Sequence, residues 1–414
     1  MTVDVAERPS RAAPARLLLL LGPAFVAAIA YVDPGNVAAN LTAGARYGYL
    51  LVWVLVAANA IAVFVQYQSA KLGIVTGRSI PELLGARLGT VGRRAYWVQA
   101  ELVAAATDIA EVIGGAIALN LLFGLPLPLG GLIVGVVALG ILSIQSRRGQ
   151  RPFEAVIVGL LAVIAVGFLA GLFVSPVDWG AAAAGLVPRF DGAETVLLAA
   201  SMLGATVMPH AIYLHSALAR DRHGASGDAG RIRTLLKATR LDVVFALIVA
   251  GAVNIAMLLV AASSLRGVAG TDTIQGAHAA ISSALGPAIG VVFAIGLLAS
   301  GLASASVGSY AGATIMGGLL KVRVPLLARR VVTLVPAVVI LAVGVDPTWA
   351  LVLSQVFLSL GIPFAMIPLL RLTGSRAIMG DAVDRVWVRV LGGAVAGAVV
   401  VLNLVLVVLT VTRG

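Results

Sequence analysis

The sequence contains no cysteine and little charge. Without cysteine, neither a disulfide framework nor a thiolate metal site can form, so any metal must bind to oxygen, imidazole or thioether ligands. Only 11% of the 414 residues are charged, whereas 60% are hydrophobic and 47 are glycines. This balance excludes a water-soluble domain and predicts a polytopic, all-α membrane protein.

Several sequence signatures of enzymes and pumps are also missing. There is no glycine-rich phosphate loop, which argues against ATP-driven pumping, and none of the four histidines has the His-Glu spacing of a hydrolytic zinc site. No segment between the apolar runs is long enough to fold as a separate domain. We therefore expect neither an enzyme nor a bound cofactor.

Apolar segments of membrane-spanning length predict eleven transmembrane helices. They fall at residues 17–44, 48–70, 95–123, 129–146, 155–174, 193–219, 241–265, 285–316, 330–345, 349–370 and 387–411. With the N-terminus inside, 25 of the 29 basic residues lie in the cytoplasmic segments; the four on the other face are Arg46, Arg189, Arg266 and Arg413. The positive-inside rule thus predicts a cytoplasmic tail at 1–16 and an extracellular C-terminus.

The net charge of +11 is explained by this orientation. Basic residues face the anionic lipid headgroups of the cytoplasmic leaflet, so the charge does not indicate a nucleic-acid partner. Between the last two helices, Asp381, Asp384 and Arg385 are interpreted as solvated loop charge.

Two of the predicted helices are interrupted by helix-breaking residues. In the first, Asp33, Pro34, Gly35 and Asn36 stand in the middle of an apolar run, where a charge costs roughly a few kcal/mol. Pro34 removes a backbone donor and Gly35 frees the local dihedral angles. The sixth predicted helix is broken in the same way around Pro209. Such breaks usually mark a site.

The two breaks occupy corresponding places in two halves of the chain. Each lies in the first of five predicted helices, and because five is odd the halves insert with opposite orientation. The pattern predicts inverted repeats at 17–174 and 193–370, with 387–411 as an additional helix. Paired broken helices in inverted repeats indicate a transporter with its substrate site near the midplane.

The residues at the breaks favour a cation as the substrate. Asp33 brings a negative charge, Asn36 an amide oxygen, and the unwound backbone frees carbonyl oxygens around Ala30 and Ala205. Met208 adds a soft thioether, which favours a transition metal over magnesium or calcium. An isolated methionine is usually a packing residue, but its place beside Pro209 favours the ligand role.

Three carboxylates in the third predicted helix form a second candidate site. Glu101, Asp108 and Glu111 are spaced by seven and three residues, which places them near one helical face. Carboxylates inside a membrane bundle mark a proton or ion path and need partners. The candidate partners are His210, His215, Arg329 and Arg330. An alternative is a purely structural ion pair between Asp108 and Arg330.

These motifs resemble the natural resistance-associated macrophage protein (Nramp) family of proton-coupled divalent metal transporters. The resemblance covers essentially the whole chain. It rests on Asp33-Pro34-Gly35-Asn36 and Met208-Pro209-His210, with support from residues 69–77 and 107–111. It implies a fold of the type called LeuT-like.

The resemblance also implies residue roles. The metal ligands would be Asp33, Asn36, Met208 and the Ala205 carbonyl, with the Ala30 carbonyl and Gln355 joining in some conformations. Asp108, Glu111, His210 and Arg330 match positions implicated in proton movement, and we add Arg329 and Glu101 as further candidates.

We therefore expect proton-coupled uptake of Mn²⁺, and also of Fe²⁺ and related ions, across the plasma membrane. The substrates would be metal ions and protons, the lipid bilayer the surroundings, and no obligatory protein partner is evident. Two alternatives remain. A sodium-coupled amino-acid transporter could share the fold, although Asp33 would repel a substrate carboxylate. A non-transporting membrane sensor or scaffold would show no uptake.

Overall fold

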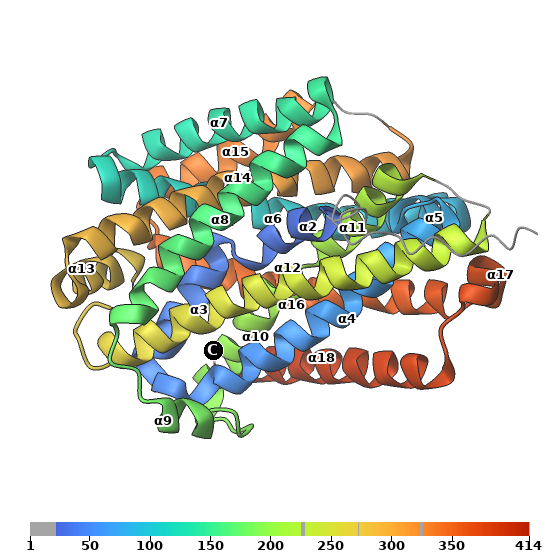
Figure 1. Cartoon of the computed structure of the whole chain (residues 1–414). Coiled ribbons are helices and arrows are strands. Elements are labelled where there is room, and N and C mark those ends of the chain that lie inside the picture. The colour runs from blue at the N-terminus through green and yellow to red at the C-terminus, as the bar shows by residue number, and fades with distance from the viewer. Residues whose placement is uncertain (1–21, 225–227, 272, 323–325, 414) are drawn as a thin grey trace, which may run out of the picture.

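The computed structural model describes residues 22–224, 228–271, 273–322 and 326–413, with backbone only at 326–331 and 410–413. Within these ranges the chain is helical apart from short connections, and its long helices run side by side as one bundle (Figure 1). The tail expected at 1–16 lies outside the described residues. Apolar side chains from most of the helices form one continuous core.

Nine segments of the described chain are long and apolar enough to cross a membrane. They are α4 (Val52–Thr76), α6 (Thr90–Phe123), α7 (Leu127–Arg148), α8 (Gln150–Val174), α10 with α11 (Gly192–Thr206 and Pro209–His223), α12 (Ala229–Ser264), α14 (Pro287–Leu320), α16 (Pro347–Thr373) and α18 (Val386–Arg413). The multi-pass, all-α membrane architecture is therefore confirmed.

The other two expected helices differ from this group. The first is split into α2 (Pro23–Ala28), the 3₁₀ turn η1 (Ile29–Tyr31) and α3 (Pro34–Tyr47). The ninth corresponds to α15 (Leu326–Val343), in which Val332–Val343 forms a shorter apolar stretch. The count of eleven spans and the division into two repeats stay predictions.

Both predicted helix breaks are present, and each restarts its helix on a proline. Val32 leaves helical geometry at φ −133° and ψ 34°, Asp33 is the N-cap of α3, and Pro34 follows as its first residue. In the second break Val207 has φ −111° and ψ 64°, and α11 begins at Pro209. Proline suits the first helical position because its missing N–H would have no partner there.

Glycines allow neighbouring helices to approach these breaks closely. A β-carbon on Gly114 of α6 would lie 1.9 Å from the Cβ of Pro34, and one on Gly204 would lie 2.0 Å from the carbonyl oxygen of Gln355 in α16. Real β-carbons do not approach other atoms so closely, so a side chain at either position would push the breaks apart from α6 or α16.

Short helices that were not predicted lie at the two ends of the bundle. They are α5 (Ile80–Arg87), α9 (Trp179–Ala184), α13 (Ile274–Leu285) and α17 (Arg376–Met379), with the 3₁₀ turns η2 (Gly48–Leu51) and η3 (Gly380–Ala382). Figure 1 shows α5 and α17 at one end and α9 and α13 at the other. The predicted topology puts α5 and α17 in cytoplasmic connections and α9 and α13 in extracellular ones. Their positions at opposite ends of the bundle agree with that topology.

The interpretation of Asp384 as solvated charge was wrong. Its side chain is almost fully buried, 2.6 Å from the Lys71 ammonium, and it accepts a hydrogen bond of 2.8 Å from Gln68 Nε2. The segment before α18 folds back onto α4, and this contact between distant parts of the chain buries the carboxylate. Asp381, by contrast, is exposed as expected.

Candidate functional site

The carboxylate of Asp33 is fully buried at the first break and receives hydrogen bonds from two helices. The backbone N–H and the side-chain Nδ2 of Asn36 donate to its Oδ1 over 2.8 and 2.7 Å. Gln355 Nε2 of α16 donates to its Oδ2 over 3.1 Å. These donors stabilise a charge that would be very costly to bury without partners.

Asn36 connects this carboxylate to the second break. Its Nδ2 also donates to the Ala205 carbonyl oxygen, at 3.0 Å, while its Oδ1 lies 3.5 Å from the Thr206 hydroxyl. The electropositive amide group thus sits between two oxygens, one from each broken helix. A cation placed between the same oxygens would meet a full charge and a carbonyl dipole.

Four of the six predicted ligands are brought together by these contacts: Asp33, Asn36, Ala205 and Gln355. Gln355 also keeps its Oε1 buried without a hydrogen-bond partner in the described part of the chain. A buried acceptor that lacks a donor is costly unless something else satisfies it, and a metal ion would do so.

The remaining two predicted ligands, the Ala30 carbonyl and the Met208 thioether, belong to residues of the helix breaks. Ala30 belongs to η1, and Met208 is the N-cap of α11; both are buried. The carbonyls of the two residues after Ala30 are already committed: Tyr31 accepts from Asn254 Nδ2 and Val32 from the Ser300 hydroxyl, each over 2.6 Å. Direct contact of Ala30 and Met208 with a metal stays a prediction.

The chemistry of this arrangement suits reversible binding of a divalent cation. Among the described residues, no three His, Cys, Asp or Glu side chains are grouped so that they could hold a metal. The candidate ligand set therefore combines one carboxylate with neutral amide, carbonyl and thioether atoms. Hard oxygens with one soft sulfur favour transition metals over magnesium or calcium.

A polar chain beside the first break was not predicted as a unit. His215 Nδ1 of α11 lies 2.6 Å from Gln66 Oε1 of α4, and Gln66 Nε2 donates to the Tyr31 hydroxyl in η1. All three side chains are buried. The signal in the sequence is a glutamine and a histidine within apolar helices, but their pairing across 149 positions has no local signature.

The three carboxylates of α6 differ in burial: Asp108 and Glu111 are buried, and Glu101 is not fully buried. Asp108 is buried and accepts a hydrogen bond from the Thr333 hydroxyl of α15. Glu111 is fully buried, and a β-carbon on Gly308 of α14 would lie 2.9 Å from its Oε2. Glu101, one end of the expected stripe, is only half-buried.

Of the predicted partners of these carboxylates, His210 is buried directly after Pro209. Its Nδ1 lies 3.4 Å from the hydroxyl of Thr107, the residue next to Asp108. The second break therefore adjoins the carboxylate face of α6. The side chains of Arg329 and Arg330 lie outside the described residues, so an ion pair with Asp108 stays a prediction.

Sequence comparisons place the chain among known membrane proteins. The family model described as natural resistance-associated macrophage protein-like matches residues 24–409. A divalent metal cation transporter MntH from Mycobacterium tuberculosis is 61% identical over 393 residues, which cover 95% of this chain and 92% of the relative. The protein of the same name from Bacillus subtilis is 44% identical over 394 residues, covering 95% and 92%.

Solved structures extend the likeness to the fold. The Eremococcus coleocola manganese transporter, in complex with an aromatic bis-isothiourea compound, is 32% identical and superposes with a TM-score of 0.85, covering 98% of this chain and 88% of that one. MhsT in complex with L-phenylalanine is 16% identical, with a TM-score of 0.58 and coverage of 92% and 98%. At that identity the match shows the fold alone, and it confirms the LeuT-like architecture.

The match over residues 24–409 includes both motifs on which the resemblance rested. The M. tuberculosis and B. subtilis relatives are also identical well above 30% across nearly their whole length. The chain therefore belongs to the natural resistance-associated macrophage protein family.

Proposed function

We propose that this protein takes up divalent transition-metal cations, foremost Mn²⁺ and also Fe²⁺, together with protons by alternating access across the plasma membrane. The observation that carries this proposal is the buried Asp33 carboxylate, joined through Asn36 to a carbonyl of the second helix break. The chain belongs to a family whose relatives are named as divalent metal cation transporters, which supports a membrane transporter of divalent metals and not an enzyme.

Binding would exchange internal hydrogen bonds for metal ligands. The amide of Asn36 points its donor side at Asp33 and Ala205, so rotation of that amide would present Oδ1 to a cation instead. Gln355 would also offer an oxygen to the cation, because its Oε1 is buried without a hydrogen-bond partner among the described residues. Met208 would then add selectivity to a site that otherwise attracts any small cation.

The membrane potential supports uptake over export. It contributes roughly 2.3 kcal/mol per charge per 100 mV, so a divalent ion gains about twice that on moving inward. Protons entering alongside would add to this driving force. Asp108 and Glu111 of α6 and His210 of α11 form the proposed proton route, because all three are buried and His210 contacts Thr107, the neighbour of Asp108.

Transport in proteoliposomes tests the function directly. Purified protein would be reconstituted under an inward proton gradient and supplied with Mn²⁺, Fe²⁺, Cd²⁺, Mg²⁺, Ca²⁺ or a mixture of amino acids. We expect uptake of the first three, with simultaneous acidification of the lumen. Uptake of an amino acid would favour the sodium-coupled alternative once Na⁺ was added, and a protein that moved none of these solutes would fit a sensor.

We expect Met208→Ala to relax selectivity rather than to abolish transport. Oxygen ligands would remain, so Mn²⁺ uptake should persist with an affinity lower by about tenfold, while Ca²⁺ and Mg²⁺ begin to compete. Competition of each ion against radiolabelled Mn²⁺ measures this.

Met257→Ala is the matched control for Met208→Ala, because it truncates a buried methionine of α12. Both variants should lose stability by about 2–5 kcal/mol from the cavity created. Only Met208→Ala should admit Ca²⁺. If it excluded Ca²⁺ as strictly as the parent does, the thioether would not be a selectivity filter.

We expect Asp108→Asn to uncouple protons from metal. An amide cannot release a proton, so Mn²⁺-driven lumen acidification should fall by about tenfold or more while Mn²⁺ still binds. Thr333→Val is the comparison, because it removes the hydrogen bond to Asp108 but keeps the carboxylate. Equal proton flux in Asp108→Asn and the parent would leave Asp108 with a structural role only.

A further inference from the structure

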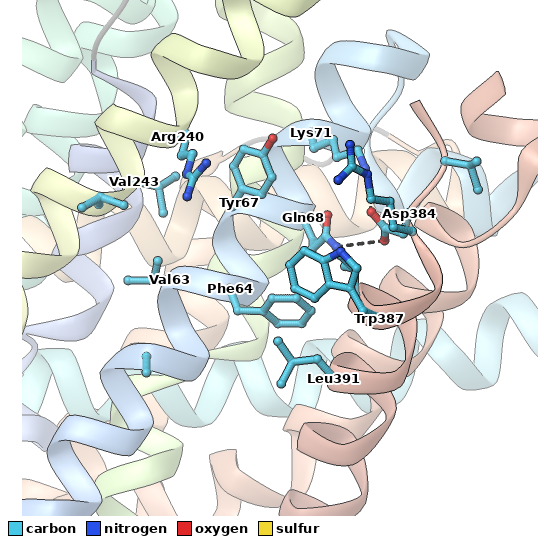
Figure 2. Close-up of a pocket in the computed structure, with 15 residues that line it drawn as sticks. Val63, Phe64, Tyr67, Gln68, Lys71, Arg240, Val243, Asp384, Trp387 and Leu391 are labelled. Atoms are coloured by element: carbon cyan, nitrogen blue, oxygen red, sulfur yellow. Dashed lines mark hydrogen bonds and ion pairs between the residues drawn. The ribbon is translucent and has the colours of Figure 1, made fainter. Parts of the chain in front are cut away.

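A cavity of about 650 Å³ lies where α4, α12 and the segment entering α18 meet (Figure 2). None of its lining residues belongs to the candidate metal site or to the proposed proton route. Its volume is in the range of pockets that hold a ligand of moderate size. Nothing in the proposed transport cycle requires it.

The wall formed by α4 changes from apolar to cationic along one helical face. Phe64, then Tyr67 and Gln68, then Lys71 line the cavity at intervals of three or four residues. At 1.5 Å per residue, this gradient extends over about 10 Å along the helix axis. Figure 2 shows Lys71 at one end of the cavity and Phe64 towards the other.

The opposite wall also changes from charged to apolar in the same direction, although its charged end includes an acidic residue. Asp384 lies beside Lys71, Trp387 follows, and Leu391 faces the apolar end near Phe64 (Figure 2). Two walls graded in parallel match a molecule with a polar head and an apolar tail. Tryptophan between the two zones is typical of the headgroup level of a membrane protein.

The polar end of the cavity carries unneutralised positive charge. Lys71 and Asp384 neutralise one another, and Gln68 Nε2 donates a hydrogen bond to the other carboxylate oxygen of Asp384. Arg240 and Arg385 also line the cavity and are exposed, and their guanidinium groups make no hydrogen bond or ion pair with any described residue. An anion is therefore the complementary ligand.

We propose that this cavity binds an anionic phospholipid, with its phosphate between Arg240 and Arg385 and its acyl chains along Phe64 and Leu391. Basic pockets between transmembrane helices on the cytoplasmic side are a recognised mode of binding anionic headgroups. A free phosphate would leave the apolar half of the cavity unused. A zwitterionic headgroup would bring an amine, and the one acidic side chain in the lining is already engaged by Lys71 and Gln68.

Native mass spectrometry of the full-length protein tests this site. The protein would be equilibrated with vesicles of equal phosphatidylglycerol and phosphatidylethanolamine and released gently from detergent. We expect phosphatidylglycerol to be retained preferentially. Each basic residue near a phosphate contributes roughly a factor of five, so Arg240→Gln with Arg385→Gln should reduce that preference about twenty-five-fold.

Two further double variants separate charge, site and folding. Lys237→Gln with Arg371→Gln removes two exposed basic residues that do not line the cavity, and should keep the preference. Arg240→Lys with Arg385→Lys keeps the charge, and should retain most of it. Size-exclusion profiles and Mn²⁺ binding should be unchanged in all three variants.

Three outcomes would overturn the lipid site. These are equal retention of the two lipids by the parent, an equal loss in the Lys237/Arg371 control, and displacement of phosphatidylglycerol by millimolar inorganic phosphate or glycerol phosphate. The last result would indicate a site for small anions only. None of these outcomes bears on metal uptake, so the lipid site and the transport function succeed or fail separately.

Discussion

Asp33→Asn is expected to lower Mn²⁺ affinity and uptake by at least about a hundredfold. Two unit charges 4 Å apart interact by about 4 kcal/mol at an effective dielectric constant of 20, and a divalent ion doubles that value. The amide oxygen of asparagine recovers part of this energy, but the loss should still exceed about 2.7 kcal/mol, which is a factor of one hundred. Calorimetry and radiolabelled uptake measure the two quantities.

This substitution should separate ligand loss from misfolding. Asp33 caps α3 by accepting a hydrogen bond from the Asn36 N–H, and asparagine is an equally good N-cap. The amide of Gln355 donates to Asp33 Oδ2, and its Oε1 has no hydrogen-bond partner among the described residues, so the amide could turn over to accept a bond from the new amide. The thermal midpoint should therefore stay near that of the parent.

Asp178→Asn is the matched control. Asp178 caps α9 through a hydrogen bond to the Ala181 N–H, but it is exposed at the end of the bundle, away from the breaks. The same chemical change with the same capping role should leave uptake intact. Mn²⁺ binding by Asp33→Asn within about threefold of the parent would remove Asp33 from the site and with it the proposed ligand set.

Gly114→Ala is expected to reduce Mn²⁺ affinity by about ten- to hundredfold, although it changes no ligand. The new methyl group would lie 1.9 Å from the Cβ of Pro34, so the first break must move away from α6. Overpacking of this kind costs about 1–3 kcal/mol, and here the strain falls on the residue next to Asp33. Isothermal calorimetry with Mn²⁺ measures the affinity.

Gly140→Ala in α7 is the control for this effect, because a β-carbon there would meet no atom within 4 Å. Alanine favours a helix over glycine by about 1 kcal/mol at either position, so intrinsic propensity cannot explain a difference between the two variants. If Gly114→Ala bound Mn²⁺ as tightly as Gly140→Ala does, the close packing of α6 on Pro34 would not set the geometry of the site.

The two helix breaks could be predicted because their signals are local. Proline and a charged or soft side chain inside an apolar run stand out within a few residues, and both breaks lie where the sequence placed them. The capping box of α5 is equally local: Ser79 and Glu82 satisfy each other's backbone N–H groups. That short helix was missed although its signature is readable.

Contacts between distant residues could not be predicted from the same patterns. Lys71 and Asp384 are separated by 313 positions, and nothing near Asp384 distinguishes a buried carboxylate from a solvated one. Gln355 entered the predicted site only through the family resemblance, because a single glutamine in an apolar helix has many explanations. Its contact with Asp33 depends on how α16 packs against α3.

The hydrogen bonds of Asn36 have a consequence for the direction of flow. If the oxygens of Asp33 and Ala205 are ligands as proposed, both can accept hydrogen bonds from Asn36 again after the cation has left. A carrier whose empty site is hydrogen-bonded internally does not need to bind a second ion in order to return to the outward-facing state. Such a carrier can return empty and therefore move cargo in one net direction under a driving force, whereas one without this internal substitute would only exchange ions one for one.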